Sequence, residues 1–216
     1  MFSKKIAILS VCFVIILSSG CSFGQSSLEK IYEHLEETVS LESGFSKVQD
    51  PLVKAEKKEQ ELFSEILTLS MEEFDKIKSL ADQASELANS RSDFLKKEKE
   101  SIHNAYEEFK SIEPIVKDLE KEKLKDKAND LVGLMKDRFK RYNELNTAYN
   151  KALEMDQKLY DMLKNEKLSL DELKKYIGQL NKQYEQVFKA QEKFNELTEE
   201  YNANKKAFYK EAGFTS

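Results

Sequence analysis

The sequence predicts an all-α protein, an elongated antiparallel bundle of three long coiled-coil-like helices with a short N-terminal helix. Charged residues make up 35% of its 216 residues, and it has only six glycines and two prolines, a composition that favours long helices over sheets and loops. Apolar residues recur every seven positions over long stretches, as in helices that wind around one another with a left-handed twist. Short connections make neighbouring helices antiparallel, so the expected shape is a rod.

The first twenty residues have the pattern of a secretory signal peptide. Lys4 and Lys5 precede an apolar run over residues 6–17, and small residues follow at positions 18–20. The run is shorter than the roughly 20 apolar residues that a membrane-spanning helix needs, so the pattern favours a cleaved signal over residues 1–20. A signal anchor that stays uncleaved is the alternative.

Cys21 predicts a lipid anchor, because small residues directly before a cysteine resemble the lipobox of bacterial lipoproteins. The signal would be cut after Gly20, and Cys21 would carry acyl chains such as palmitate at the head of a linker over residues 21–27. Ser18 departs from the pattern, which often has leucine there. Two or more acyl chains hold a protein stably on a membrane, so we expect it on the outer face of the cytoplasmic membrane. An ordinary secretory signal with an incidental cysteine is the alternative.

The helical domain is expected over residues 28–216, and it begins with a short helix. Ser26-x-x-Glu29 forms a capping box, apolar residues at helical spacing follow it, and Gly44 ends the pattern. Asp50-Pro51 then predicts the start of a second helix, with aspartate as the N-cap and proline at the first helical position.

The second helix is expected to run from Pro51 to Ile112, ~90 Å if unbroken. It carries an apolar series at seven-residue spacing, Phe74, Ala81, Ala88, Leu95, Ile102 and Phe109. A companion series from Ile77 to Ile112 is apolar except at Arg91 and Glu98. Ser70-x-x-Glu73 is another capping box, which leaves open a kink near Ser70.

Glu113-Pro114 predicts the turn into a third helix, because the residue before a proline avoids the helical conformation. This helix carries apolar residues up to Leu163, and residues 165–168 connect it to a fourth helix that Ser169-x-x-Glu172 caps. The fourth helix again has a seven-residue series, Leu173, Leu180, Val187, Phe194, Tyr201 and Phe208.

Arg91 and Arg138 predict a buried polar layer. If the hairpin turns at Glu113-Pro114, residues whose numbers sum to about 229 lie level, which brings Arg91 beside Arg138, and the next connection brings Glu196 to the same level. We expect carboxylates such as Glu98 or Glu196 to neutralise both arginines. Fixing the helix register is the favoured role; arginines that reach solvent and a ligand site are the alternatives.

No catalytic, cofactor or metal site is predicted. His34 and His103 lie on different helices without a cysteine or second histidine at ligand spacing, and the chain has no G-x-S-x-G elbow, Walker loop or glycine cluster for phosphate. The net charge of −5 becomes −7 once Lys4 and Lys5 leave with the signal, which argues against binding nucleic acid. We therefore expect a non-enzymatic protein.

Two surface features are candidates for binding, each with a structural alternative. The lysine-rich run over residues 117–127 has opposite charges three residues apart, which is typical of a self-paired helix surface, and a modest basic patch surrounds Lys140. Tyrosines concentrate on the third and fourth helices, where they can stack on sugar rings, although most fall on or beside the apolar series and serve the core.

Two segments carry a family resemblance, "LYDMLKNEKLSLDEL" over residues 159–173 and "KFNELTEEYNANKKAFYKEAGF" over residues 193–214. With the lipobox-like start, they resemble the cell-wall-binding lipoproteins of Gram-positive bacilli and staphylococci, the YkyA-like family. The resemblance covers nearly the whole mature chain. It implies an elongated helical bundle outside the cell with the wall as its partner, and it implies no catalytic residues.

The leading hypothesis is therefore a lipid-anchored, non-enzymatic rod, which Cys21 holds in the membrane and which binds cell-wall material, either peptidoglycan or its attached polymers. The alternative is an envelope scaffold or adaptor that binds another protein or itself through an exposed helical face. A carrier of a small ligand between its helices is a third class, for which the sequence shows no recognisable pocket.

Overall fold

The computed structural model describes residues 26–214. The predicted signal peptide over residues 1–20, Cys21 and the linker as far as residue 25 lie outside the described residues. In chain order, the elements are α1 (Ser27–Leu41), α2 (Ser43–Ile66), a 3₁₀ turn η1 (Met71–Glu73), α3 (Phe74–Phe109), α4 (Ile112–Val116), α5 (Glu122–Leu163) and α6 (Leu170–Ala212). No strand occurs within residues 26–214.

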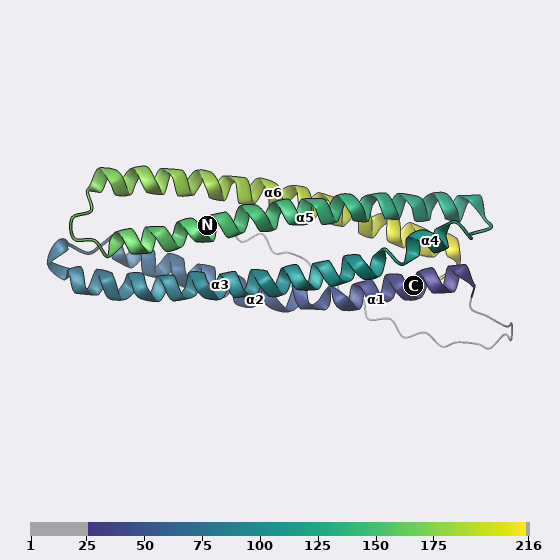
Figure 1. Ribbon diagram of the computed structural model, residues 1–216, viewed down its shortest axis with the longest axis horizontal. Coiled ribbons are helices and arrows are strands. Elements are labelled where there is room, and N and C mark those ends of the chain that lie inside the picture. Colours follow the sequence, from purple (N-terminus) through teal and green to yellow (C-terminus); the bar gives the residue numbers. More distant parts are fainter. Residues whose placement is uncertain (1–25, 215–216) are drawn as a thin grey trace.

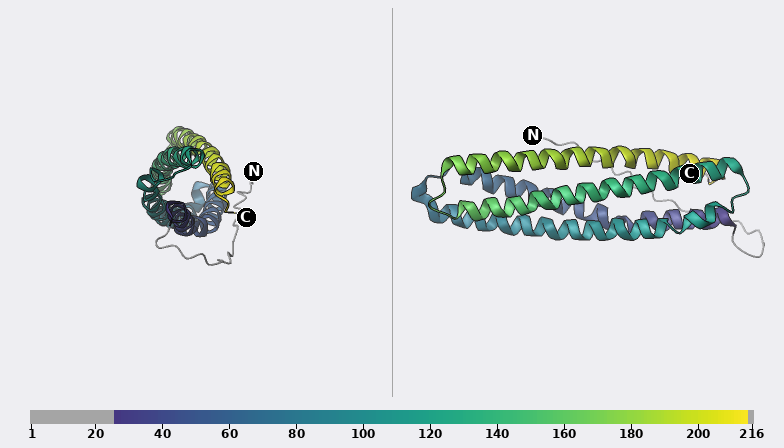
Figure 2. Two further views of the ribbon diagram at one scale, coloured as in Figure 1. Left: turned by 90° about the vertical axis from the view of Figure 1, so that its right-hand side faces the viewer. Right: turned by 45° about the horizontal axis from the view of Figure 1, so that its top comes forward.

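The helices form a rod in which successive segments run up and down the same axis (Figure 1). α1 and α2 follow one another along one side, α3 returns beside them, and α5 and α6 complete the bundle, as the end-on view in Figure 2 shows. We call the end where α1 begins, α4 lies and α6 finishes the proximal end, and the opposite end the distal end. The rings of Tyr32 and Phe214, whose centroids are 4.5 Å apart, bring the two ends of the described chain together at the proximal end.

The all-α class and the elongated antiparallel bundle of long helices are confirmed. Two capping boxes begin α1 and α6 as predicted, at Ser26 with Glu29 and at Ser169 with Glu172. At the other end of α6, Gly213 takes a left-handed backbone conformation (φ 81°), which glycine adopts without steric cost.

The expected bounds of the first two helices are wrong, because α2 continues through both Gly44 and Pro51. Gly44 serves packing between helices, since a Cβ on it would lie 3.0 Å from the Cβ and Oγ of Ser101 on α3. Ser101 also holds the kink between α1 and α2: its Oγ accepts from the Phe45 amide at 3.0 Å and donates to the Leu41 carbonyl at 2.6 Å. Packing against α3 thus overrides the local helix-ending signals.

The expected continuous helix from Pro51 to Ile112 is also wrong, because the chain reverses over residues 67–70. Ser70 caps the next segment, so the site considered for a kink is a full turn. α2 and α3 pack antiparallel as a consequence. The rod is therefore built from four helical segments of comparable length in place of three long helices and a short one.

The core follows the seven-residue series. In α3, the companion series that contains Arg91 and Glu98 is buried throughout. α6 buries Leu180, Val187, Phe194, Tyr201 and Phe208 of its seven-residue series, together with Gln183. Two apolar clusters result, one in the distal half and one in the proximal half. α6 thus presents a single narrow row to the bundle, and most of its surface faces solvent.

Candidate functional site

The first candidate is a largely buried group of charged and phenolic side chains in the distal half, in which Glu56 and Tyr184 are partly exposed. It comprises Arg91, Glu56, Glu59, Tyr149, Asp156, Tyr160 and Tyr184, which we call the Arg91 cluster. Helices α2, α3, α5 and α6 all contribute to it.

Arg91 is the centre of the cluster, and its side chain is 4% exposed. Its Nη1 donates to Glu59 Oε2 at 2.5 Å and lies 3.3 Å from Asp156 Oδ2. Its Nη2 donates to the hydroxyls of Tyr149 at 3.0 Å and Tyr184 at 2.9 Å. One guanidinium from α3 therefore ties together residues of the other three helical segments.

Phenols also donate hydrogen bonds to each of the three carboxyl groups. Tyr160 donates to Glu59 Oε1 at 2.7 Å, while Tyr149 donates to Glu56 and Tyr184 donates to Asp156. Buried charges that are paired and hydrogen-bonded in this way specify one arrangement of their helices.

The cluster holds three carboxyl groups and one guanidinium, so its charges are not balanced if all are ionised. Burial, together with the neighbouring Glu59, raises the pKa of Asp156 to about 7. Burial also raises the pKa of Glu56 against the opposing effect of Arg91. Although burial alone would lower the pKa of Arg91, the acidic groups around it raise that pKa, so the guanidinium stays charged.

Arg138 lies in a second buried site, nearer the proximal end. It holds Glu42 with two hydrogen bonds, Nη1 to Oε1 at 2.5 Å and Nη2 to Oε2 at 3.1 Å, and its Nε donates to Thr198 Oγ1 at 3.0 Å. The rings of Phe194 and Tyr201 lie 5.2 Å and 5.9 Å from the guanidinium carbon. Glu42 is the single residue between α1 and α2, so this pair binds the kink to α5.

Arg91 and Arg138 are therefore not in one layer, contrary to the prediction. Pro114 lies inside α4, and the chain turns over residues 117–121, about one heptad later than expected. Tyr106 of α3 stacks on Phe139 with centroids 3.9 Å apart, so Arg138 is level with the region of Tyr106. That region lies about 22 Å along α3 from Arg91, at 1.5 Å per residue.

The two glutamates expected to neutralise the arginines do not contact them. Glu98 is buried and accepts from Gln49 Nε2 at 2.7 Å, and burial raises its pKa to about 7. Glu196 is exposed on α6, close to the level of Arg138 as predicted but turned to solvent. Thr198 takes its place beside Arg138.

The true partners left a signal in the sequence that the prediction did not use. Glu59 stands seven residues from the buried Leu52 and Ile66, and Asp156 stands seven residues from the buried Tyr149 and Leu163. Each of these acidic residues occupies a core position of its helix, as Arg91 does in α3. A shared ionic layer requires such charged core positions on several helices.

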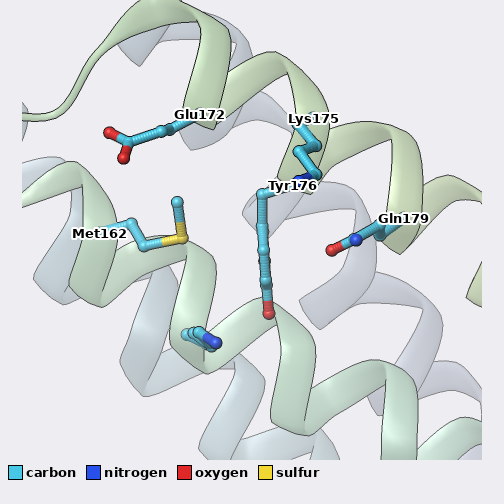
Figure 3. A pocket seen from close by; sticks show the side chains of 6 residues that line it. Met162, Glu172, Lys175, Tyr176 and Gln179 are labelled. Atoms are coloured by element: carbon cyan, nitrogen blue, oxygen red, sulfur yellow. The ribbon is translucent and has the colours of Figure 1, made fainter.

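The second candidate is an open groove on the outside of the bundle, between α5 and α6. Its distal part is a hollow of about 200 Å³ lined by Lys158, Met162, Glu172, Lys175, Tyr176 and Gln179. Figure 3 shows the Tyr176 ring standing between Met162 on one side and Gln179 on the other. The Tyr176 hydroxyl donates to the Met155 carbonyl at 3.0 Å, which fixes the ring in place.

The middle part of the groove is wider, with a volume of about 700 Å³. It is lined by Lys136, Phe139, Lys140, Asn143, Glu144, Thr147, Ala148, Lys151, Gln183 and Gln186. Lys151 and Lys158 are seven residues apart on α5, as are Gln179 and Gln186 on α6, and residues at this spacing share a helix face. The two hollows are thus parts of one strip, which we call the α5–α6 groove.

The groove is basic on an acidic protein. Its lining has five lysines and two glutamates, whereas the whole chain has a net charge of −5. Both glutamates are engaged: Glu144 accepts from Arg141 at 2.8 Å and Glu172 accepts from the Ser169 amide in the cap of α6. Lys136 pairs with Glu113 at 2.9 Å. Positive charge is therefore left on the other four lysines.

Those four lysines, Lys140, Lys151, Lys158 and Lys175, are exposed and form no ion pair within 4.0 Å with any residue of the described chain. Lys158 Nζ lies 5.5 Å from the centroid of the Tyr176 ring. A side chain set of this kind can bind anions through the ammonium groups and can offer an aromatic face to a sugar or an alkyl segment.

Of the other surface candidates, the lysine-rich run is paired differently from the sequence interpretation, whereas most of the tyrosines serve the core as expected. In the lysine-rich run, Lys123 pairs with Glu211 of α6 at 2.7 Å, and Lys125 donates to the Lys117 carbonyl. Of the tyrosines on the third and fourth helices, Tyr142, Tyr149, Tyr160 and Tyr201 are buried. Tyr176 is the one that lines the groove.

The described residues 26–214 hold no group of three or more histidine, cysteine or acidic side chains suited to a metal ion. His34 Nδ1 lies 2.6 Å from Glu108, and His103 lies beside Phe139 with centroids 6.2 Å apart. None of the helices within this range is long and apolar enough to cross a membrane.

Comparisons with known proteins agree with the fold and extend over most of the chain. A family model described as "Putative cell-wall binding lipoprotein" matches residues 26–211. The "Uncharacterized lipoprotein YkyA" of Bacillus subtilis (strain 168) is 31% identical over 209 residues, which are 97% of this chain and 93% of that protein. A crystal structure of a conserved protein of unknown function from Staphylococcus aureus matches with a TM-score of 0.75 at 14% identity, over 88% of this chain and 98% of that one. The last similarity concerns the fold alone.

Proposed function

Since the chain belongs to the family described as "Putative cell-wall binding lipoprotein", we propose that it is a lipid-anchored, non-enzymatic protein that binds cell-wall material outside the cytoplasmic membrane. The observation that carries this proposal is the α5–α6 groove, with four unpaired lysines and the Tyr176 ring on the outside of the bundle. The ligand is peptidoglycan or a polymer attached to it.

The anchor is proposed to be Cys21, acylated after the signal over residues 1–20 is cut. The described chain begins at Ser26, at the proximal end, so the linker would hold that end close to the membrane. The helical bundle would form the domain from residue 28 to residue 216. α6 alone spans roughly 64 Å at 1.5 Å per residue, so the distal hollow would stand several nanometres above the lipid.

The anchor has its own test. Mass spectrometry of the mature protein should show an N-terminal peptide that begins at Cys21 and carries at least two acyl chains. A peptide that retains residues 1–20, or an unmodified Cys21, would contradict the lipid anchor and would leave the groove unaffected.

Wall binding is tested by cosedimentation of the detergent-solubilised mature protein with purified sacculi across a salt series. Saturable binding that weakens as salt rises supports the proposal, because exposed charges are screened by salt. Absence of binding to every preparation would contradict it. A protein partner or a second copy of the chain, as in the adaptor hypothesis, would then have to be sought by cross-linking.

A further inference from the structure

We infer that the α5–α6 groove binds a linear phosphate-bearing polymer in preference to an uncharged glycan strand. This inference rests on the proposed wall binding and names the chemistry of the ligand. Four features of the groove support it: its charge, the lack of partners for its lysines, the spacing of those lysines, and the engagement of its neutral polar groups.

The charge of the groove is opposite to that of the molecule. The lining carries five lysines against two glutamates, on a chain of net charge −5. A polyanion is repelled by the molecule as a whole and attracted to this strip, so the field of the protein steers it there.

The four lysines form no ion pair that joins two helices of the described chain, and within that chain the only cation–π contact that any of them makes across the groove is that of Lys158 with Tyr176. Lys140, Lys151, Lys158 and Lys175 are exposed and form no ion pair with a described residue. Lys151 and Lys158 stand on the same face of α5, where like charges add nothing favourable to helix stability. Their charge is therefore available to a ligand.

The spacing of these lysines fits an extended ligand. Lys151 and Lys158 are about 10 Å apart along the axis, and Lys140 and Lys158 about 27 Å apart, at 1.5 Å per residue. A single small anion cannot span such distances, whereas a chain with repeated negative charges can contact several lysines at once. Lys175 faces Lys158 across the distal hollow, so the polymer would run between the two helices.

The neutral polar groups are largely used within the protein. Asn143 donates to the Phe139 carbonyl, Thr147 to the Asn143 carbonyl, and Gln183 to the Ala148 carbonyl, all at 2.8–2.9 Å. An uncharged glycan is recognised through hydrogen bonds to its hydroxyl groups, for which these side chains offer few free donors. The four lysines, together with Gln179 and Gln186, are what remains for recognition, and the lysines favour phosphate.

The test compares two variants with the same change in net charge. The groove variant is Lys140→Gln/Lys151→Gln/Lys158→Gln/Lys175→Gln. The control variant is Lys54→Gln/Lys57→Gln/Lys97→Gln/Lys99→Gln, at exposed positions of α2 and α3. Both should keep the helical circular dichroism and thermal midpoint of the natural protein, since all eight lysines are exposed.

Each mature, detergent-solubilised protein is titrated with purified poly(glycerol phosphate) and is cosedimented with sacculi before and after chemical removal of their phosphate polymers. We expect the natural and control proteins to bind the polymer and the untreated sacculi. Their binding to sacculi should be lost once the phosphate polymers are removed. The groove variant should lose on the order of tenfold or more in affinity and should show a shallower dependence on salt, because fewer phosphate contacts are made.

The outcomes separate this inference from wall binding itself. Undiminished binding to stripped sacculi would overturn the phosphate polymer as ligand and leave wall binding standing. An equal loss of affinity in the groove and control variants would overturn the groove as the site. No binding of the natural protein to any sacculi would contradict the proposed function as well.

Discussion

At the scale of single residues, the Arg91 cluster is where a small change has the largest effect. One guanidinium holds Glu59 at 2.5 Å and Asp156 at 3.3 Å, and all three side chains are buried. Removal of one partner of a buried ion pair leaves the others charged and without compensation, which costs more than the intact pair contributes.

Arg91→Met should therefore lower the free energy of unfolding by about 3–5 kcal/mol, the usual cost of an unpaired buried charge. Urea unfolding followed by circular dichroism measures it. Arg141→Met is the control, because Arg141 pairs with Glu144 on the surface and should change stability by less than about 1 kcal/mol. Equal effects of the two variants would contradict a register-fixing role for the Arg91 cluster.

The buried carboxyl groups also predict how stability changes with pH. The pKa values of Asp156 and Glu98 are raised to about 7 in the folded protein, so the folded state holds their protons more tightly than the unfolded state does. The stability that these two groups contribute to the folded state is fully present below the ordinary carboxyl pKa near 4 and is lost as the pH rises towards 7. Mild acid should stabilise the protein through these two groups.

Asp156→Asn/Glu98→Gln should remove this dependence. The free energy of unfolding of the natural protein should fall between pH 5 and pH 7.5 by roughly 2 kcal/mol per group more than that of the variant. Urea unfolding at the two pH values provides the comparison. A natural protein whose stability changes with pH no more than that of the variant would rule out the two groups as its source.

At the scale of helices, the sequence predicted the second half of the chain better than the first. α6 begins and ends near the expected residues, because its capping box and seven-residue series agree. α5 ends at Leu163 as expected, although it begins at Glu122, after the displaced turn. Gly44 and Pro51 misled the prediction in the first half, since both read as helix boundaries. Contact of Gly44 with Ser101 and burial of Leu52 and Ala55 beside Pro51 are tertiary effects that the local sequence does not contain.

A pair of glycines tests whether packing accounts for Gly44. Gly178→Ala should raise the free energy of unfolding by about 0.5–1 kcal/mol through helix propensity, because a Cβ there meets no atom within 4 Å. Gly44→Ala gains the same propensity, but its Cβ would lie 3.0 Å from two atoms of Ser101. We expect the free energy of unfolding of Gly44→Ala to be lower than that of Gly178→Ala by roughly 1 kcal/mol or more. Thermal and urea unfolding of both variants measure the difference. Equal gains in the two variants would contradict a role for the contact with Ser101.

At the scale of the whole molecule, the reversal over residues 67–70 sets the length of the rod. An unbroken helix from Pro51 to Ile112 would alone exceed ~90 Å, whereas α6, the longest helix found, spans roughly 64 Å. Small-angle X-ray scattering of the mature chain in solution should give a maximum dimension nearer 75 Å than 100 Å. A value above ~95 Å would contradict the hairpin between α2 and α3 or would reveal an end-to-end dimer.

The candidate sites were less predictable than the fold, because they depend on which residues the assembled helices bring together. The seven-residue series identify which positions face inward, and they singled out Arg91, Arg138 and Glu98 as unusual core residues. They do not give the partners, because displacing the turn from Pro114 to residues 117–121 moves the partner of each α3 residue on α5 by twice that displacement, about two heptads. The α5–α6 groove depends further on which lysines find carboxylates, as Lys136 does with Glu113, and that is settled only when the helices are assembled.

The position of both ends of the described chain at the proximal end has a mechanical consequence. If the linker fixes that end to the membrane and a polymer is held in the groove, tension acts along the axis, parallel to every helix. Such a load would slide α6 past α1, against contacts such as the hydrogen bond from Tyr209 to Glu36 at 2.6 Å. All the side-chain contacts between the two helices would then be loaded at the same time. A pull across the axis would open them one after another. The rod would therefore bear the greater force in the direction in which an anchored wall polymer draws it.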